Sequence, residues 1–444
     1  MHVEAKLNVN NMSLTIPNQS IFQALQEPSK TSSEVLNNIR TQALEKIQLL
    51  GLVTKKHEDY RYLNFSSVYN QTFSDDISST VISKQEFSHL IPTFENVNFL
   101  VLINGNFRID LSTVISTNQE ITISTLQEAI VNNKSIVEKY LGTKADLNDS
   151  FVALNSAYAN DGLFIHVPAK STVENTTVIV HLSDSQTGNK LLVQNRNLFV
   201  CEKQSKAQVI ELHVSLGNEI GFNNHVTEIF VAENAHFEHF NIQNEHDKLT
   251  LVNTTQVHQF RDSVYSNAIF TFNGNIVRNN TNTILDAENI LANLWGLFMP
   301  SGTSIIDNHT IVDHAKPHCN SNELYKGVLN DKGIGVFNGK IFVREDAQKT
   351  NAFQSNRTIL LSDEATINTK PQLEIFADDV KCSHGATSGQ LDAESLFYLR
   401  SRGLSEKSAK ALLVNAFASE VLENINNEAL KLYLEEQISL KLPY

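Results

Sequence analysis

The chain has 444 residues, enough for one large solenoid or for two to three compact domains. Its 49 acidic and 35 basic side chains leave a formal charge of −14, which disfavours nucleic acid as a partner because phosphates would be repelled. Hydrophobic residues make up 41%, and the longest apolar runs, such as Asn98–Ile103, are far too short to cross a membrane. The first residues contain no basic segment leading into an apolar one, so we expect no export signal and a cytoplasmic location.

The three cysteines, Cys201, Cys319 and Cys382, are well separated and odd in number. A disulfide framework is therefore not expected, and reduced thiols suit a cytosolic protein. Three thiols are also too few for an ordinary iron–sulfur cluster site, which takes four cysteines. If the chain handles iron or sulfur, it must do so incompletely or together with a partner.

The N-terminal part, residues 1–80, is predicted to be mainly helical. Apolar residues recur at helical spacing over Ile21–Leu52. Ser32 or Ser33 is a suitable N-cap for this helix, and Gly51 lies at its end.

The central part, residues 81–390, reads as β structure with one helical insertion near 125–142. Short segments rich in β-branched and aromatic residues follow one another, separated by Asn, Asp, Gly or Ser. Many short strands without crossover helices predict a sandwich, a barrel or a β-solenoid. The length of the run, with no strict sequence repeat, favours an irregular right-handed parallel β-helix. We interpret Asn330–Gly333 as the turn of a β-hairpin within it.

The pattern returns to helix in residues 391–444. Asp392 is expected to cap a helix that ends before Gly403, and Ser405 is expected to cap the next one. A third helix is expected over about Glu428–Leu440. Such a region either caps the open end of a solenoid or forms a docking surface. The second of these helices is expected to bury a stripe formed by Ala409, Leu412, Leu413, Ala416, Phe417 and Val421.

The segment Phe376–Gly385 carries the most suggestive pair of side chains. In an extended strand Cys382 and His384 project from the same face. A thiolate and an imidazole form a soft pair suited to iron, copper or zinc, and Gly385 permits close approach of a ligand or another backbone. Two ligands do not complete a tetrahedral site, so the pair predicts an open or shared site. The alternative is a buried cysteine beside a hydrogen-bonded histidine.

Two other polar clusters are weaker candidates for metal binding. In one, His236 and Glu238 would share one face of a strand whereas His239 would face the other, so a structural role is expected. The other has a spacing that matches no standard zinc arrangement. Neither a phosphate-binding loop nor a nucleophile elbow is present in the sequence, so any nucleotide hydrolysis must belong to another chain. The second cluster consists of Asp307, Asn308, His309, Asp313, His314, His318 and Cys319.

About 85 residues, from His318 to Gly403, contain a series of motifs whose order resembles that of the SufB/SufD family of iron–sulfur cluster assembly proteins. The motifs are Pro317–Cys319, Tyr325–Leu329, Gly335–Ile341, Ala347–Thr350, Leu360–Ala365, Thr369–Ile375, Ala377–Thr387, Gly389–Asp392 and Leu396–Gly403. Upstream, Asp161–Pro168 resembles the segment that opens the family's β-helix. Gly51–Tyr62 resembles the family's N-terminal pattern, with departures at Val53, Tyr60 and Arg61.

The resemblance implies a non-catalytic scaffold subunit that acts in nascent cluster formation. Cys382–Thr387 has the form of the SufD branch and not the Glu-His-Glu-Ala-Thr expected of SufB. The resemblance then implies that His384 helps to form the cluster together with a SufB cysteine, with Cys382 a weaker candidate. No cofactor would be held tightly by this chain alone. Iron or a cluster would be bound transiently and shared with SufB.

The resemblance also implies two protein partners and no nucleic acid or membrane. SufB would pair with this chain through the β-helix, and the ATPase SufC would dock on the C-terminal helices. Two alternatives remain open: a homodimeric scaffold acting without SufB, because solenoid edges invite self-pairing, and a carbohydrate-active β-helix enzyme, which needs clustered carboxylates in a groove. The expected SufC contact consists of Leu396, Tyr398, Arg400, Arg402 and Gly403.

Overall fold

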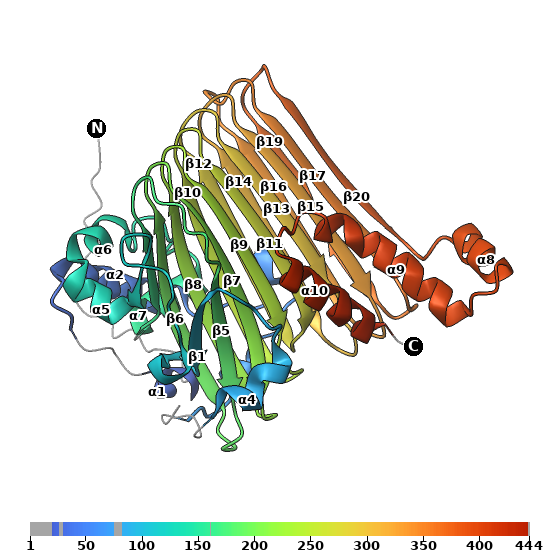
Figure 1. The fold of residues 1–444 in the computed structure, drawn as a ribbon, viewed down its shortest axis with the longest axis horizontal. Helices are drawn as coiled ribbons and strands as arrows, with labels where there is room; N and C mark the ends of the chain where they lie inside the picture. Colours follow the sequence, from blue (N-terminus) through green and yellow to red (C-terminus); the bar gives the residue numbers. More distant parts are fainter. Residues whose placement is uncertain (1–19, 26–29, 75–81, 160, 443–444) are drawn as a thin grey trace, which may run out of the picture.

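The protein is described from a computed structural model, which covers residues 20–442 apart from 26–29, 75–81 and 160. Its main body is a parallel β-solenoid made of two ten-stranded sheets that face each other (Figure 1). Helical segments flank it on the N-terminal and C-terminal sides. The predicted fold class, a mainly β solenoid with helical flanks, is confirmed.

From β4 to β18 successive strands of the chain alternate between the two sheets, and neighbours are parallel except in the β1–β2 and β3–β4 pairs. Sheet A consists, in spatial order, of β2 (Asn106–Phe107), β1 (Asn98–Ile103), β5 (Thr177–Asp184), β7 (Lys206–Leu216), β9 (His236–Asn244), β11 (Val264–Asn273), β13 (Leu291–Phe298), β15 (Asn320–Leu329), β17 (Asn351–Leu360) and β20 (Lys381–Gly389). Sheet B consists of β18 (Thr366–Thr369), β16 (Ile334–Val343), β14 (Ile305–His314), β12 (Ile276–Leu285), β10 (Leu249–Gln259), β8 (Gly221–Val231), β6 (Leu191–Cys201), β4 (Leu163–Val167) and β3 (Thr122–Thr125), with β19 (Gln372–Ile375) also paired to β16.

The predicted hairpin at Asn330–Gly333 is wrong. β15 before it lies in sheet A and β16 after it lies in sheet B, so the segment is a corner between sheets. Asp331 adopts a positive φ of 53° there, a conformation that tight turns also use. The backbone of each strand pairs instead with strands one turn away along the solenoid, for example Asn308 of β14 with Phe337 of β16.

The N-terminal helices cover part of the outer face of sheet B. Aromatic and aliphatic side chains from this face, including Phe164, Leu198 and Phe230, pack against α5 and α6. The predicted insertion near 125–142 is two short helices, because Asn133 ends one and begins the next. The helical elements of this part are α1 (Ser20–Ala24), α2 (Glu34–Leu50), η1 (Glu58–Tyr60), α3 (Ser66–Tyr69), α4 (Lys84–Phe87), η2 (Ser88–Leu90), η3 (Ile109–Leu111), α5 (Leu126–Asn132), α6 (Lys134–Tyr140) and α7 (Ser150–Tyr158).

The three C-terminal helices are α8 (Ala393–Ser401), α9 (Glu406–Leu422) and α10 (Glu428–Lys441). α9 and α10 lie across the outer face of sheet A, and α8 projects away from the body (Figure 1). Lys326 of β15 fastens α9 to the sheet, since its Nζ donates to Phe417 O at 2.6 Å and forms an ion pair with Glu420 at 2.5 Å. Among the described helices, none is both long enough and apolar enough to cross a lipid bilayer.

The helix ends follow the predicted capping residues. Ser33, Asp392 and Ser405 each accept a backbone hydrogen bond at an N-terminus, at 3.4, 2.7 and 3.0 Å. Gly51 ends α2 with φ 69°, and Gly403 follows α8 with φ 93°.

The predicted buried stripe of α9 is partly wrong. Ala409 and Val421 are buried, but Leu412 is 50% exposed and Ala416 is also exposed, whereas Val414 and Ala418 are buried against sheet A. Apolar residues lie on all sides of this helix, so their spacing alone did not identify the face that packs.

Candidate functional site

His384 lies on the last strand of sheet A, at the open end of the solenoid. β20 pairs with β17 only, so one edge of β20 has no partner strand among the described residues. Register places Cys382 and His384 beside the buried residues Ala352 and Gln354, which shows that both side chains belong to the inward-facing set. His384 is nevertheless exposed, as is every residue from there to the end of the strand. A Cβ added at Gly385 would meet nothing within 4 Å.

A column of inward-facing polar residues leads from His384 into the solenoid. His384 is the register partner of Gln354, and Gln354 is that of Glu323. Gln354 Nε2 donates to Glu323 Oε2 at 2.7 Å, and Thr310 Oγ1 donates to the other carboxyl oxygen. Burial raises the pKa of Glu323 to about 7 in spite of these bonds. This carboxyl therefore changes its protonation state near neutral pH. It lies on β15, two strands along sheet A from the exposed His384.

Burial raises the pKa of all three cysteine thiols. For Cys319 it reaches about 11, and Cys201 lies fully inside the core. Cys382 is half-buried, packs beside the cluster that contains Ile341 and Val343, and also has a raised pKa. The thiolate is the form that binds metal. These thiols therefore stay protonated near neutral pH, which leaves the His384 imidazole as the readier ligand of the predicted pair.

The larger of the two weaker clusters does not converge. His309 lies 3.1 Å from the buried carboxylate of Asp307, which is also paired with Arg278 at 2.8 Å. Asp313 binds Arg344 on the surface, and His314 points into the core, where its Nε2 lies 2.9 Å from Ser321 Oγ. His318 is exposed at a corner and Cys319 is buried, with its Sγ donating to Ala287 O. The structure gives these residues separate structural partners.

The residues expected to contact an ATPase lie on or next to α8. Within the described chain this helix has no buried residue. Tyr398 is exposed, and the guanidinium of Arg402 lies over its ring at 5.2 Å. Arg400 lies 3.6 Å from Glu406 of α9, while Leu396 is half-buried and Gly403 is exposed. The structure thus presents these side chains on a projecting element.

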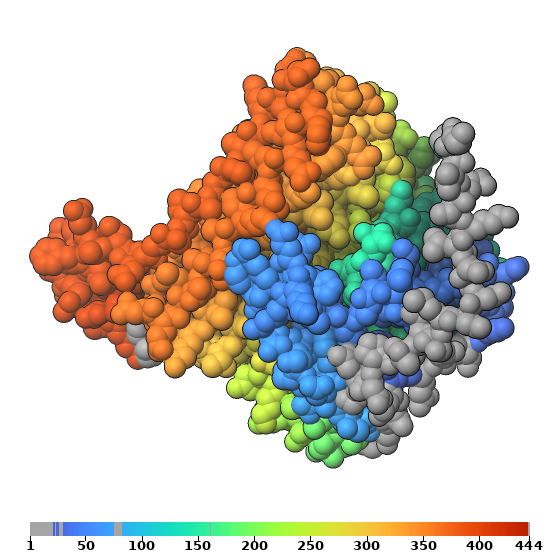
Figure 2. Space-filling view, turned by 180° about the vertical axis from the view of Figure 1, so that it is seen from behind, coloured from blue at the N-terminus to red at the C-terminus, as the bar shows by residue number. Residues whose placement is uncertain are grey.

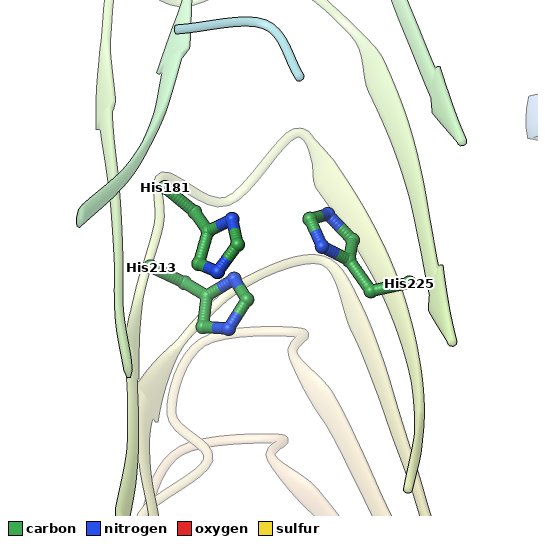
Figure 3. Close-up of side chains that lie close together, drawn as sticks. All are labelled: His181, His213 and His225. Carbon is green, nitrogen blue, oxygen red and sulfur yellow. The ribbon is translucent and has the colours of Figure 1, made fainter. Parts of the chain in front are cut away.

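The sequence reasoning missed a cluster of titratable residues inside the solenoid. His181, His213 and His225 are all buried and point toward one another (Figure 3). Burial, with the nearby ring of His181, lowers the pKa of His213 to about 3 and lowers that of His225 well below its usual range. Although burial alone would raise it, hydrogen bonds from His181 and His239 hold the pKa of Glu211 well below its usual range.

One signal in the sequence could have revealed this cluster. His181 and His213 are register partners and stand 32 residues apart, one turn of the solenoid. Other turns have different lengths, for example 27 residues between the partners Ala268 and Trp295. A variable period hides such pairs, because residues that align in space do not recur at a constant spacing. The third member, His225, comes from the opposite sheet.

A neighbouring carboxyl makes the stability of this interior depend on pH. Glu245 is buried, and its Oε1 accepts bonds from Ser183 Oγ at 2.6 Å and Asn223 Nδ2 at 2.9 Å. Burial nonetheless raises its pKa to about 7. Because the folded state keeps this proton up to a higher pH than the unfolded chain, stability is present at low pH and is lost as the pH rises through about 7.

Replacing Glu245 by Gln is therefore expected to leave stability at pH 5 nearly unchanged and to raise it at pH 8 by on the order of 3 kcal/mol relative to the parent chain. The measurement is urea unfolding followed by circular dichroism across that range. Glu364→Gln, at an exposed surface position, serves as the control and should leave the pH profile as it is. Parallel profiles for Glu245→Gln and the parent would contradict the prediction.

Comparison with known proteins places the whole chain in one family. The SufBD core domain of the SUF system for FeS cluster assembly matches residues 181–417, and the SufBD N-terminal region matches residues 19–179. The chain belongs to the SufBD family of iron–sulfur cluster assembly proteins. The match to the core domain includes the solenoid from β5 onward, His384 and α8.

Curated SufBD proteins resemble the chain over nearly its full length. An iron–sulfur cluster assembly SufBD family protein of Synechocystis is 31% identical over 433 residues, which is 95% of each chain. The iron–sulfur cluster assembly protein SufD of Escherichia coli is 31% identical over 90% of this chain and 92% of its own. SufD of Bacillus subtilis is 26% identical over the full length of both. The family resemblance predicted from the motifs is confirmed.

Proposed function

We propose that this SufBD protein is the SufD-type subunit of a cytoplasmic scaffold on which iron–sulfur clusters are assembled, and that it takes part without catalysing a reaction of its own. The placement of His384 carries the proposal. Its register puts it on the inward face of the sheet, but it is exposed because it lies on the last strand, whose edge has no partner among the described residues. Full-length relatives named SufD support it, and the three free cysteines suit a reducing compartment. Family membership gives no support to a carbohydrate-active role.

The free edge of β20 is the proposed contact with a SufB-type partner. An unpaired strand offers a row of backbone N–H and C=O groups that a strand of a second solenoid can continue. Such pairing would bring side chains of the partner next to His384 and enclose a site that is open in this chain. The partner's strand would close the open side of the site and supply further ligands.

His384 is proposed to act as a transient ligand to the cargo, which is iron or a nascent cluster. A neutral imidazole donates one nitrogen to iron, and a thiolate of the partner supplies the soft anionic ligand. Cys382 is the weaker candidate because its thiol is half-buried and has a raised pKa. One nitrogen from this chain does not hold iron tightly, so the cargo is able to leave again.

ATP hydrolysis is assigned to a SufC-type subunit docked on α8 and its connection to α9. Leu396, Tyr398, Arg400, Arg402 and Gly403 remain the predicted contact. The exposed aromatic and aliphatic side chains around them favour such an interface. Because α9 is fastened to β15 through Lys326, a force on α8 would pass to sheet A near its open end.

The test is the cluster content of the assembled complex. The chain is co-expressed with its SufB-type and SufC-type partners, the complex is purified without oxygen, and iron and acid-labile sulfide are measured. His384→Ala is expected to lower cluster content about tenfold, because loss of a ligand or its support weakens metal binding by about that factor or more. The circular dichroism spectrum should be unchanged, since the side chain is exposed in this chain. Complex formation should persist, because the proposed pairing along β20 is made by backbone groups.

His318→Ala is the matched control, because this exposed histidine sits at a corner between β14 and β15 and has no part in the proposed site. The complex that carries it should contain as much cluster as the parent. Normal cluster content in His384→Ala would show that this imidazole is not required.

A homodimeric scaffold is the second candidate, because the same free edge of β20 is able to pair with a second copy. Light scattering of the isolated chain, and again with the SufB-type partner added, separates the two. Conversion of a homodimer into a heterodimer when the partner is added supports the proposal. A homodimer that persists unchanged in the presence of the partner supports the alternative.

A further inference from the structure

Three buried histidines inside the solenoid form a cluster that the proposed function does not use. One possible ligand atom from each of His181, His213 and His225 lies within 4.8 Å of the other two. His181 of β5 and His213 of β7 are neighbours in sheet A, with stacked rings whose centroids are 4.6 Å apart. His225 of β8 faces them from sheet B, with its ring centroid 5.0 and 5.2 Å from theirs (Figure 3).

Three of the six ring nitrogens of this cluster lack, within the residues that the structure describes, the partners that buried polar atoms normally have. Among the described residues, neither nitrogen of His213 has a hydrogen-bond partner, and neither does Nδ1 of His225. Asn241 lies beside His213 but makes no hydrogen bond of normal geometry with it. Burying such nitrogens unpaired costs free energy. A metal ion bound to their lone pairs would offset that cost.

One ring nitrogen of His181 is hydrogen-bonded to a carboxylate, as is typical of a histidine that binds a metal through its other nitrogen. Its Nε2 lies 2.7 Å from Glu211 Oε2, and the other oxygen of Glu211 lies 2.6 Å from His239 Nε2. Metal ligands of this type usually bond a carboxylate through one ring nitrogen and the metal through the other. With the proton on Nε2, the Nδ1 atom of His181 keeps its lone pair. Glu211 also places a negative charge close to the cluster.

We propose that His181, His213 and His225 bind one divalent first-row transition metal ion, Fe²⁺ or Zn²⁺, inside the solenoid. Imidazole nitrogens are preferred ligands of these ions, and three of them leave one coordination position open. With metal–nitrogen bonds of about 2.0–2.1 Å, ligand nitrogens of a tetrahedral site lie about 3.3 Å apart. The possible ligand atoms now lie within 4.8 Å of one another, so binding requires the rings to turn and the nitrogens to draw closer. Within the described part of the chain, neither nitrogen of His213 and not Nδ1 of His225 has a hydrogen bond that turning the ring would break. The ion would link sheet A to sheet B.

The test uses the isolated full-length chain, because every ligand comes from this chain. The protein is refolded without oxygen in the presence of Zn²⁺ alone, or Fe²⁺ alone, and desalted, and the bound metal is measured by mass spectrometry. We expect about one ion per chain, and about tenfold less in His213→Leu and in His225→Leu. His314→Leu is the matched control, since His314 is equally buried in the same solenoid but lies outside the cluster, and it should retain the full amount.

Retention of a full equivalent by both cluster variants would place the metal on surface histidines and overturn the proposal, as would failure of the parent chain to hold either ion. X-ray absorption of the zinc-loaded parent keeps the proposal testable if a variant does not fold. A first shell with three imidazole nitrogens supports it, and a first shell with sulfur or with fewer than three imidazoles overturns it.

Discussion

Replacing Glu228 by Ala is expected to lower the free energy of unfolding by about 3–5 kcal/mol, the range for removing one partner of a buried ion pair. This fully buried carboxylate of β8 accepts a bond from Arg196 Nη2 at 2.6 Å. It also accepts backbone N–H bonds from Gly142 at 2.7 Å, Lys144 at 3.1 Å and Ala145 at 3.2 Å. Its loss leaves a buried guanidinium and three donors without their acceptor. Urea unfolding followed by circular dichroism measures the change.

The same variant should loosen the N-terminal helices, because the loop that Glu228 holds connects α6 to α7. Protection from proteolysis in this loop is therefore expected to fall more than protection in β15 or β17. Glu233→Ala is the control. Glu233 pairs with Lys203 on the surface at 2.9 Å, and such exposed pairs contribute about 0–1 kcal/mol. Equal losses for the two variants would contradict a special role for Glu228.

Local signals in the sequence predicted the helix ends well because each end depends on a few neighbouring residues. Ser33, Asp392 and Ser405 act as N-caps whose partners are three residues away. Gly51 and Gly403 take the positive φ that other residues avoid. These interactions need no knowledge of the tertiary fold, so the pattern of residue types is sufficient.

The path of the solenoid was harder to predict because its pairing is entirely non-local. Asn330–Gly333 has the composition of a hairpin turn, yet the strands on either side enter different sheets. Such a four-residue pattern indicates that the chain turns and does not indicate which strand pairs with which. Turn lengths that vary between register pairs, as for His181 with His213 and Ala268 with Trp295, removed the repeat that would have shown it.

The candidate site was predictable only in part for the same reason. Alternation along a strand placed Cys382 and His384 on one face, and the register agrees. That His384 is exposed follows from its position on the last turn, which depends on where the solenoid stops. The buried histidine cluster needs the two sheets to face each other, since His225 lies across from His181 and His213. The spacing of residues in the sequence does not indicate which side chains of one sheet face those of the other.

The proposed docking element has an exposed apolar surface that the rest of the fold does not cover. Phe397 is 75% exposed and Tyr398 is 57% exposed on α8, with Leu404 and Leu412 close by in the chain. The space-filling view shows this segment as a lobe set off from the body (Figure 2). Deleting every residue after Asp392 would not test it cleanly, because α9 and α10 cover the apolar outer face of sheet A. A single substitution on α8 leaves this face of sheet A covered.

Phe397→Asp is expected to weaken binding of the SufC-type ATPase about 30-fold or more, because a central aromatic of an interface contributes about 2 kcal/mol or more and the new charge would be desolvated on docking. Binding of the SufB-type partner should be unchanged, since the free edge of β20 lies in the solenoid and not on α8. Titration of the purified chain with each partner by calorimetry measures both affinities. Leu440→Asp on α10 is the matched control: Leu440 is 71% exposed but belongs to a helix that is packed on sheet A, so ATPase binding should persist. An unaltered ATPase affinity in Phe397→Asp would show that the docking site does not lie on α8. The proposed transmission of force from that helix through Lys326 to sheet A would then have no basis.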